Sequence, residues 1–250
     1  GEKHLMGRGF GTEKVEDYIR ELFPEARVAR MDLDTTRTRK AYERLIGDFA
    51  SGKTNLLVGT QMISKGLDFD KVSVVGILNA DTMLNMPDFR AYEYAFAMMA
   101  QVSGRAGRKG HQGMVYLQTR NPDLPVIQQV VDNDFKGFYR GVLEERKMFS
   151  YPPFTHVVNV FLKHRKDNVV ESAALELGSR LRTVFGDRVL GPDKPSVARV
   201  KQQFIRKLIL KMETGLDYKK MRLYLRQTQA ELMKDKRYGA LTVYYDVDPQ

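Results

Sequence analysis

The 250-residue chain contains no cysteine and no tryptophan. Without cysteine it can form neither a disulfide nor a zinc site built from thiolate ligands. It also has no apolar run of the roughly 20 residues that a membrane-spanning helix needs, and no secretory leader precedes the first expected helix. These absences predict a soluble, cytoplasmic protein without a membrane partner, and the length allows one large or two ordinary domains.

Both signs of charge are present, but they are unevenly placed along the chain. The sequence has 41 Lys and Arg against 31 Asp and Glu, a net charge of +10. Residues 151–250 hold 19 basic and 11 acidic residues, net +8, which leaves 22 and 20, net +2, for residues 1–150. A basic second half favours a polyanion as partner and makes such binding depend on salt, although ordinary solubilising lysines would give the same balance.

Helical and strand patterns alternate through the first half of the chain. Val15, Ile19 and Leu22 have the spacing of one helix face, with Thr12 as the expected N-cap and Pro24 as the stop. Strict alternation of helices and strands implies a mainly parallel sheet with right-handed crossovers. The further elements expected are a strand at 27–31, a helix at 36–51, strands at 55–59 and 72–78, a helix from Pro87 to Gln101 and a strand at 114–118.

The second half has a different order of elements. A helical pattern runs over 122–147, and the segment Tyr151-Pro152-Pro153-Phe154 cannot continue it. We therefore predict two domains, residues 1–148 and 149–250. The elements expected in the second are a strand at 156–162, a helix at 168–185, short strands near 189 and 196–201, a strand at 204–212, a helix at 218–233 and a strand at 241–247. This β-α-β-β-α-β order is that of a ferredoxin-like α+β domain.

Two arginines in the segment Gln101–Arg108 carry the strongest chemical signal. Arg105 and Arg108 are three residues apart among small residues, a spacing that predicts both guanidiniums on one face of a helix end. A rigid arginine pair suits phosphate oxygens and the charge that builds on a transferring phosphoryl group. The alternative is a basic helix end that stabilises its own dipole.

A polar segment, Thr60–Asp68, directly follows the expected strand at 55–59. Open α/β sheets bind ligands just beyond the carboxyl ends of their strands. Alone, such a segment is a weak signal that a simple turn would also give. Combined with the arginine pair about forty residues downstream, it indicates a phosphate-binding site.

These two segments resemble motifs V and VI of superfamily 2 helicases, which lie in the second RecA-like motor lobe. More narrowly, the chain resembles the PriA family, or primosomal protein N′ family, of replication-restart DNA helicases. The resemblance implies an α/β fold, with a RecA-like lobe of the P-loop NTPase type followed by a smaller α+β, ferredoxin-like domain that binds DNA or partners. The stretches that carry it are Gly9–Glu13, Arg30–Thr35, Pro87–Ala91, Gln101–Arg108 and Tyr151–Phe154.

The resemblance also implies roles for single residues. Arginine fingers would reach the γ-phosphate of ATP held mainly by the other lobe, and a glutamine beside that phosphate would sense it. Thr60 and Asp68 would equally suit the capping of local turns. The implied residues are Arg105, Arg108 and Gln101 for catalysis, Gly66 and Asp68 for the nucleotide, and Thr60, Gln61 and Lys65 for the DNA backbone.

The chain departs from the PriA family in what it lacks. Family members carry a cysteine-rich zinc-binding insertion and a first motor lobe with a Gly-Lys-Ser/Thr phosphate loop, and neither pattern occurs in these 250 residues. We therefore expect a C-terminal part that is inactive by itself. In the complete protein the cofactors would be ATP and Mg²⁺, with zinc only in the insertion.

The function that the resemblance implies is ATP-dependent 3′→5′ DNA unwinding at stalled or branched forks, leading to primosome assembly. The implied partners are forked or single-stranded DNA, the single-strand DNA-binding protein and other primosome proteins. Two alternatives stay open: another superfamily 2 repair translocase, and a non-motor nucleic-acid-binding scaffold.

Some further residues are weaker candidates. Phe89 and Arg90 would either contact DNA or anchor the start of a helix. The four histidines show no spacing typical of a metal site, and we predict none. A set of basic residues alternates on the strand faces of the second domain, and some of them would form a DNA or partner surface: Arg199, Lys201, Arg206 and Lys211.

Overall fold

The computed structural model describes residues 11–60, 72–107, 113–215 and 217–249. The chain divides into two compact units, residues 1–135 and residues 136–250. We refer to them as the first and the second unit. The domain boundary predicted between residues 148 and 149 stays a prediction.

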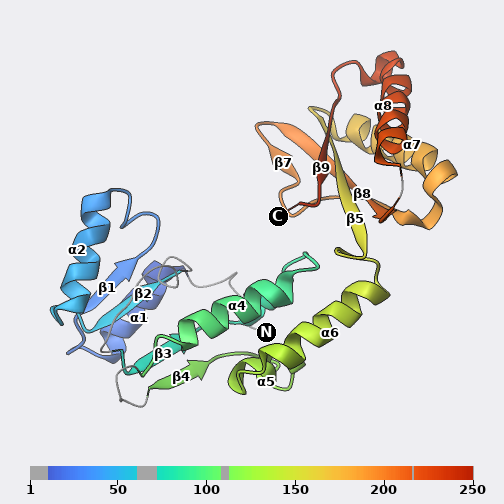
Figure 1. Cartoon of the computed structure of the whole chain (residues 1–250). Helices are drawn as coiled ribbons and strands as arrows, with labels where there is room; N and C mark the ends of the chain where they lie inside the picture. The colour runs from blue at the N-terminus through green and yellow to red at the C-terminus, as the bar shows by residue number, and fades with distance from the viewer. Residues whose placement is uncertain (1–10, 61–71, 108–112, 216, 250) are drawn as a thin grey trace, which may run out of the picture. The chain divides into compact units, whose positions relative to one another are not determined.

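The described part of the first unit combines helices with two two-stranded parallel sheets (Figure 1). The predicted strict alternation is not observed there, because two strands and then two helices follow one another directly among the described elements. Strand β1 pairs in parallel with β2, and β3 pairs in parallel with β4. This part of the chain is thus of the α/β class. Its elements are α1 (Thr12–Leu22), β1 (Val28–Met31), α2 (Arg39–Ala50), β2 (Leu56–Gly59), β3 (Val74–Ile77), α3 (Asp81–Leu84), α4 (Ala91–Ser103), β4 (Met114–Leu117) and α5 (Pro125–Val131).

Two of the predicted helix starts were wrong. Gly11, and not Thr12, is the N-cap of α1, and Thr12 is the first helical residue. Helix α2 begins at Arg39 because Thr38 caps it, its hydroxyl accepting a hydrogen bond from the backbone N–H of Ala41 at 3.2 Å. The residues before Thr38 instead form a turn that the next subsection describes.

Two other predicted helices also differ from the structure. Helix α4 begins at Ala91 and not at Pro87. The single helix predicted over 122–147 is two helices, α5 and α6 (Phe135–Met148), separated by a turn in which Asn133 has φ of +54°. A left-handed residue of this kind cannot lie inside an α-helix, and asparagine adopts it more readily than most residues.

The second unit contains one antiparallel sheet in the order β6-β8-β5-β9, with the short strand β7 also paired to β8. Strand β8 lies between β5 and β6, and β5 lies between β8 and β9, which is the split β-α-β arrangement of a ferredoxin-like domain. The prediction of this fold is confirmed. Its elements are β5 (Thr155–His164), α7 (Asp167–Phe185), β6 (Val189–Asp193), β7 (Arg199–Val200), β8 (Gln203–Glu213), α8 (Tyr218–Met233) and β9 (Thr242–Val247).

One face of this sheet packs against α7 and α8, which lie on the same side of it (Figure 1). The side chains of a strand point alternately to the two faces, so the even-numbered residues of β5 and β8 point to the helices. The buried cluster on that face includes Val158, Val160, Leu162, Leu208 and Leu210. It is a continuous apolar core, and every residue of it belongs to the second unit.

Arg206 lies on this helix-covered face and is almost completely buried. Its guanidinium is 2.6 Å from the carboxylate of Asp167 and also pairs with Glu171. The prediction that Arg206 contributes to a binding surface was therefore wrong. Of the other basic residues predicted there, Arg199 and Lys201 are exposed, and Lys211 donates a hydrogen bond to the carbonyl of Phe149 at 2.6 Å.

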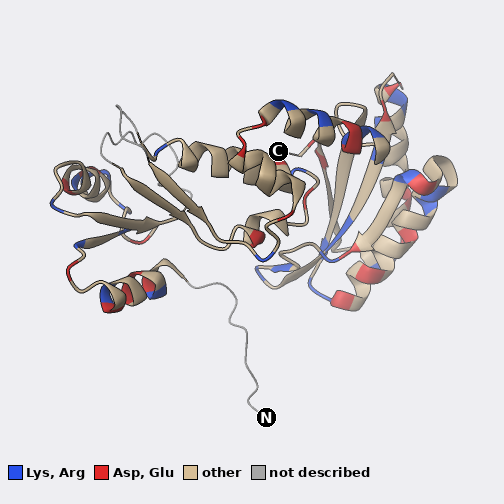
Figure 2. Ribbon diagram, turned by 90° about the horizontal axis from the view of Figure 1, so that it is seen from below, with Lys and Arg blue, Asp and Glu red and all other residues tan. Residues whose placement is uncertain are grey.

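Charged residues are concentrated on the helices and loops of the first unit. Figure 2 shows Lys, Arg, Asp and Glu along its outer helices, whereas β2, β3 and β4 carry no charged residue. Such uncharged strands are typical of parallel sheets, which are covered on both faces. Across the ranges that the structure describes, no helix is long and apolar enough to cross a membrane.

Candidate functional site

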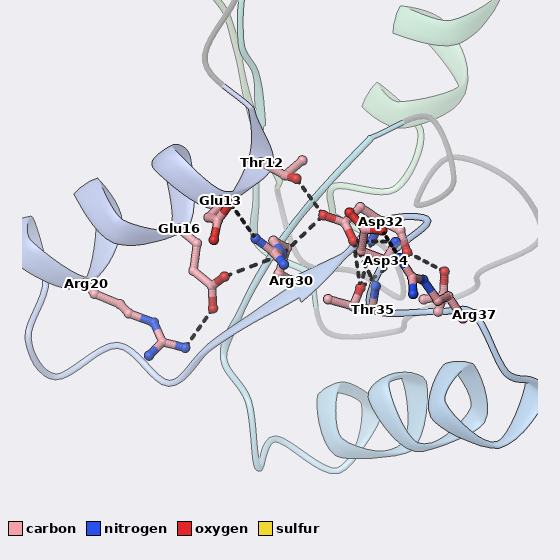
Figure 3. A network of polar contacts seen from close by, with 10 residues as sticks. Thr12, Glu13, Glu16, Arg20, Arg30, Asp32, Asp34, Thr35 and Arg37 are labelled. Carbon is pink, nitrogen blue, oxygen red and sulfur yellow. Dashed lines mark hydrogen bonds and ion pairs between the residues drawn. The ribbon is translucent and has the colours of Figure 1, made fainter.

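A network of polar contacts surrounds Asp32, the residue directly after strand β1 (Figure 3). The Thr12 hydroxyl, at the start of α1, donates a hydrogen bond of 2.7 Å to one carboxylate oxygen. The other oxygen accepts hydrogen bonds from the backbone N–H groups of Asp34 and Thr35, both at 3.0 Å. One carboxylate thus ties the start of α1 to the end of β1 and to the turn beyond it.

Arg30 places a positive charge beside this carboxylate. Its guanidinium lies 3.1 Å from Asp32, 3.7 Å from Glu16 and 3.9 Å from Glu13. The Arg30 side chain is 19% exposed, so water screens these contacts less than it screens a surface pair. Two of the acidic residues of α1, Glu13 and Glu16, point to the same arginine (Figure 3), which fixes the helix against the strand.

The pKa of the Asp32 carboxyl is lowered from 3.8 to about 2. The hydrogen bond from Thr12 is the largest cause, and hydrogen bonds from Thr35 and the charge of Arg30 add to it, while burial of the carboxyl opposes them. Asp32 therefore stays ionised at neutral pH. A carboxylate in that state only accepts hydrogen bonds, so this group is suited to holding structure and not to general acid catalysis.

Thr60, a predicted DNA contact, lies beside this network at the strand ends. In the parallel register Met31 is opposite Gly59, so the next residues, Asp32 and Thr60, leave their strands at the same edge of the sheet. Thr60 is exposed. The other predicted residues of this segment, Gln61, Lys65, Gly66 and Asp68, lie outside the described residues.

The arginine segment follows helix α4. Gln101 is an exposed residue in the last turn of α4, and Arg105 lies in a turn beyond the helix end at Ser103. The backbone N–H of Arg105 donates to the carbonyl of Val102 at 3.0 Å, which continues the helix as a tight turn. Arg105 thus lies two residues beyond the last residue of the helix, at the helix end that was predicted for it but not within the helix itself. Arg108 lies outside the described residues.

The backbone after Arg105 is held close to strand β3. Gly107 has φ of +70°, and its N–H donates a hydrogen bond of 3.0 Å to the carbonyl of Val72. Gly113 approaches so closely that a Cβ added to it would lie 2.2 Å from the nitrogen of Gly107. Only glycine fits at such a crossing. The turn that carries Arg105 is therefore fixed at both of its ends.

Asp81 makes a second carboxylate contact between strand ends. It follows β3 and accepts hydrogen bonds from the Thr119 hydroxyl at 2.8 Å and the Arg120 N–H at 2.9 Å, both just beyond β4. The pKa of Asp81 is lowered, mainly by the hydrogen bond from Arg120. In the described part of the first unit, each parallel strand pair thus has an ionised aspartate at its carboxyl end.

Arg90 and Phe89 stabilise the start of α4, which agrees with the structural alternative. The Arg90 guanidinium makes two contacts of 3.2 Å with the Asp88 carboxylate and lies over the Phe89 ring at 4.9 Å. The hydrogen bonds that Arg90 donates to the Asp88 carboxylate raise the pKa of Arg90. In the ranges that the structure describes, no three His, Asp or Glu side chains are grouped so that they could hold a metal ion.

Comparison with known proteins assigns both units. Residues 10–110 match the helicase conserved C-terminal domain, and residues 147–250 match the primosomal protein N C-terminal domain. The second match decides the narrower family, because the domain that it identifies in the ferredoxin-like unit is that of primosomal protein N. The chain belongs to the PriA family.

The relatives of known name are replication restart proteins PriA. The chain is 39% identical to that of Bacillus subtilis over 84% of its own length, 37% identical to that of Synechocystis over 98%, and 34% identical to that of Haemophilus influenzae over 100%. It spans 26%, 28% and 34% of the lengths of these PriA proteins, respectively. Its first unit accordingly corresponds to the second RecA-like helicase lobe.

The sequence analysis missed the roles of Thr12, Asp32 and Asp81. The stretches around Thr12 and Asp32 were used to identify the PriA resemblance, but nothing local indicated that their side chains meet across 20 residues of sequence. A useful signal was present for Asp32, since an aspartate followed by Asp34 and Thr35 directly after a strand is typical of a side chain that bonds its own turn.

Proposed function

We propose that the chain is the C-terminal part of an ATP-dependent DNA helicase that unwinds DNA in the 3′→5′ direction at stalled or branched forks and so restarts replication. Membership of the PriA family is the observation that carries this proposal. The chain spans about a third or less of the length of its relatives, so the complete activity requires residues beyond those of this sequence.

The turn after α4 is proposed to supply positive charge to ATP held mainly by another lobe. Gln101 lies in the last turn of α4, and Arg105 lies four residues further on, in the turn that follows the helix. The turn is fixed by hydrogen bonds to Val102 and Val72, so Arg105 would meet a phosphate with little loss of freedom. These residues fit one wall of a nucleotide site, to which we add Arg108, Gly66 and Asp68 from outside the described ranges.

ATP, with Mg²⁺, supplies the phosphoryl group whose hydrolysis drives the motor. Arg105 and Arg108 stabilise the negative charge that this reaction develops, and Gln101 distinguishes the state with an intact γ-phosphate. Since arginines of this kind interact differently with ATP and with ADP, they bias the lobe between two positions and so couple hydrolysis to movement. Zinc is proposed only for the cysteine-rich insertion of the complete protein.

The edge of the first unit beside Thr60 is proposed to bind the DNA backbone. Thr60 is exposed at the end of β2, and Gln61 and Lys65 follow it in the sequence. The ionised Asp32 holds the neighbouring strand end and its turn in place, which preserves the shape of that edge. Residues 149–250 are proposed to form a domain that binds DNA and partners, among them the single-strand DNA-binding protein and other primosome proteins.

The proposal is tested by DNA-stimulated ATP hydrolysis in the longer polypeptide that joins this sequence to a first motor lobe. The variants are Arg105→Ala and Arg108→Ala. Loss of an arginine finger lowers turnover by about 10³-fold or more, while binding to forked DNA is expected to persist.

A matched control removes an arginine that faces solvent in the same unit. Arg44→Ala serves, because the Arg44 side chain is 79% exposed and pairs with Asp48 one turn along α2. This variant is expected to hydrolyse ATP at the normal rate. Normal turnover in both Arg105→Ala and Arg108→Ala would reject the motor assignment and favour a nucleic-acid-binding scaffold.

A further inference from the structure

The sheet of the second unit has a face that its helices do not cover. The odd-numbered residues of β5 and β8 point to this face, opposite the core. We call it the open face and define it by Asn159, Phe161, Lys163, Lys207 and Tyr244. The ends of the face are buried at Val157 and Ile205, while the residues between them are partly exposed.

Two aromatic rings stack on the open face. Phe161 of β5 lies directly across from Tyr244 of β9 in the strand register. Their ring centroids are 4.9 Å apart and their planes differ by 14°. Tyr244 is 37% exposed, so part of its ring is accessible to a ligand. A nucleobase is a flat π-system of similar size and stacks on such a pair.

Two lysines flank this aromatic pair, and neither forms an ion pair with a described residue. The Lys163 ammonium lies 4.5 Å from the Tyr244 ring centroid. Lys207 of β8 lies across from Phe161 on its other side. Within the described ranges neither lysine forms an ion pair, whereas Arg180, Arg188 and Arg237 of the same unit all do. The open face also carries carboxylates: Asp193 of β6 lies across from Lys207, Asp246 of β9 lies across from Asn159, and Glu213 of β8 pairs with Arg188.

This arrangement favours a single strand over a duplex. Bases in a duplex are already stacked and paired, so a protein ring gains access to them only where the strand is open. One lysine on each side of the aromatic pair supplies positive charge to the phosphates of a nucleic-acid backbone that passes over the rings. The amide of Asn159, which makes no hydrogen bond to any described residue, is next to Phe161 on the same face and is free to bond a base edge.

We propose that the open face is a binding platform for single-stranded DNA, with a base stacked on Phe161 and Tyr244 and phosphates at Lys163 and Lys207. The choice of DNA rests on the proposed function. The platform itself acts without ATP and without the arginine segment of the first unit, so the two proposals fail independently.

The absence of tryptophan makes a direct test possible. Phe161→Trp in the 250-residue chain introduces a single tryptophan at the platform, whose emission can be excited apart from that of the 12 tyrosines. Leu223→Trp places one on the exposed surface of α8, where Leu223 is 56% exposed. Each protein is titrated with an oligo-dT of about 15 nucleotides, the upper range of one binding site, at low salt. We expect the oligonucleotide to quench the fluorescence of the Phe161→Trp protein and to leave that of the Leu223→Trp protein unchanged. Equal quenching of both proteins, or no quenching of the Phe161→Trp protein, would overturn the proposal.

Affinity measurements on further variants test the stacking itself. Phe161→Leu keeps an apolar residue in the strand but removes the ring, and it is expected to weaken oligo-dT binding about tenfold, whereas Phe161→Trp retains the affinity. The proposal fails if Phe161→Leu binds like the wild type. It also fails if a duplex of the same length binds more tightly than the single strand and quenches the Phe161→Trp protein as strongly.

The two lysines are tested by the salt dependence of binding. Lys163→Gln with Lys207→Gln is expected to reduce the slope of log K against log salt by about 1.4, the value for two phosphate contacts of a single strand. The matched control, Lys219→Gln with Arg226→Gln, removes the same charge from the exposed side of α8 and is expected to keep the slope. An equal reduction in both pairs would mean unspecific attraction to a basic domain and would overturn the platform.

Discussion

The two units of this chain differ in the contacts that stabilise each of them internally. In the second unit, the large buried cluster between the sheet and α7 and α8 is continuous and apolar. In the first unit, α1 and α2 contain no buried residue, and carboxylates at strand ends join the elements instead. The second unit therefore depends on the fit of its core. The attachment of α1 and α2 in the first unit depends on a few charged hydrogen bonds.

The comparison also suits the two proposed roles. The ionised Asp32 of the first unit holds the edge where Thr60 lies, so its polar contacts add to the buried Met31 and Val58 in keeping the shape of that edge. The second unit covers one sheet face with helices, and its core therefore leaves the other face available to a ligand. The second unit is thus stabilised from the side away from its proposed binding surface, whereas the Asp32 contacts of the first unit lie beside its own.

A cavity in the core of the second unit is the strongest test of the difference between the two units. Leu208 is completely buried in β8, so Leu208→Ala is expected to destabilise that unit by about 3 kcal/mol. Hydrogen exchange should speed up in residues 136–250 only. The control Ile209→Ala, on the opposite face of the same strand, should cost less. Equal acceleration in the first unit would mean that the units do not differ as described.

The buried ion pair of the second unit tests the same difference between the units, because it is a polar contact beside an apolar core. The double variant Asp167→Asn with Glu171→Gln leaves the buried Arg206 guanidinium without a counter-charge, and we expect a loss of about 3 kcal/mol. Arg206→Met should cost less, because both carboxylates are more than 40% exposed and become hydrated. Denaturant unfolding of the two variants measures the difference. The reverse order would contradict this description of the pair.

Much of the fold could be predicted because long periodic segments determine it locally. The helix expected at 218–233 is observed without change, capped by the Asp217 side chain. Thr12 was misjudged because its hydroxyl bonds a residue 20 positions away, which no local capping rule includes. Arg206 was misjudged although the signal was in the sequence: it shares its strand face with Leu208 and Leu210, and two-residue periodicity places all three on one side.

The candidate site was less predictable than the fold. Gln101, Arg105 and Thr60 could be named from motifs, since motifs are contiguous in sequence. The aspartate contacts and the stacked pair of Phe161 and Tyr244 could not, because they depend on the register between strands that are distant in the chain. A register cannot be derived from the pattern of either strand alone.

In the first unit, Asp32→Asn tests the dependence on a single carboxylate. The substitution removes the charge that Thr12, Thr35 and Arg30 stabilise, and we expect a loss of about 2 kcal/mol, seen as faster exchange in α1 and β1. The control Asp34→Asn affects an exposed pair with Arg37 and should change little. If Asp32→Asn leaves the exchange rates in α1 and β1 unchanged, the apolar contacts of this unit are enough to stabilise these elements.

The pH dependence of the same residue gives the smallest effect. The pKa of Asp32 is about 2 in the folded chain against 3.8 as the ordinary value, so its contribution is complete above pH 3.8 and is lost as the pH falls toward 2. The difference in stability between the wild type and Asp32→Asn, at most about 2 kcal/mol, should therefore shrink between about pH 5 and pH 2. A difference that stays constant over this range would contradict the assigned pKa.

The order of strands in the second unit also sets a waiting time during synthesis. Strand β5 lies in the middle of the sheet, yet its neighbours β8 and β9 are made later, and β9 starts only after residue 241. Ribosomes add roughly 5–20 residues per second, so β5 waits on the order of 4–16 s for its last partner. Throughout that interval an apolar strand has an unpaired edge, the feature on which misassembly and aggregation begin. The nascent chain is therefore expected to depend on chaperones most strongly between the synthesis of β5 and that of β9.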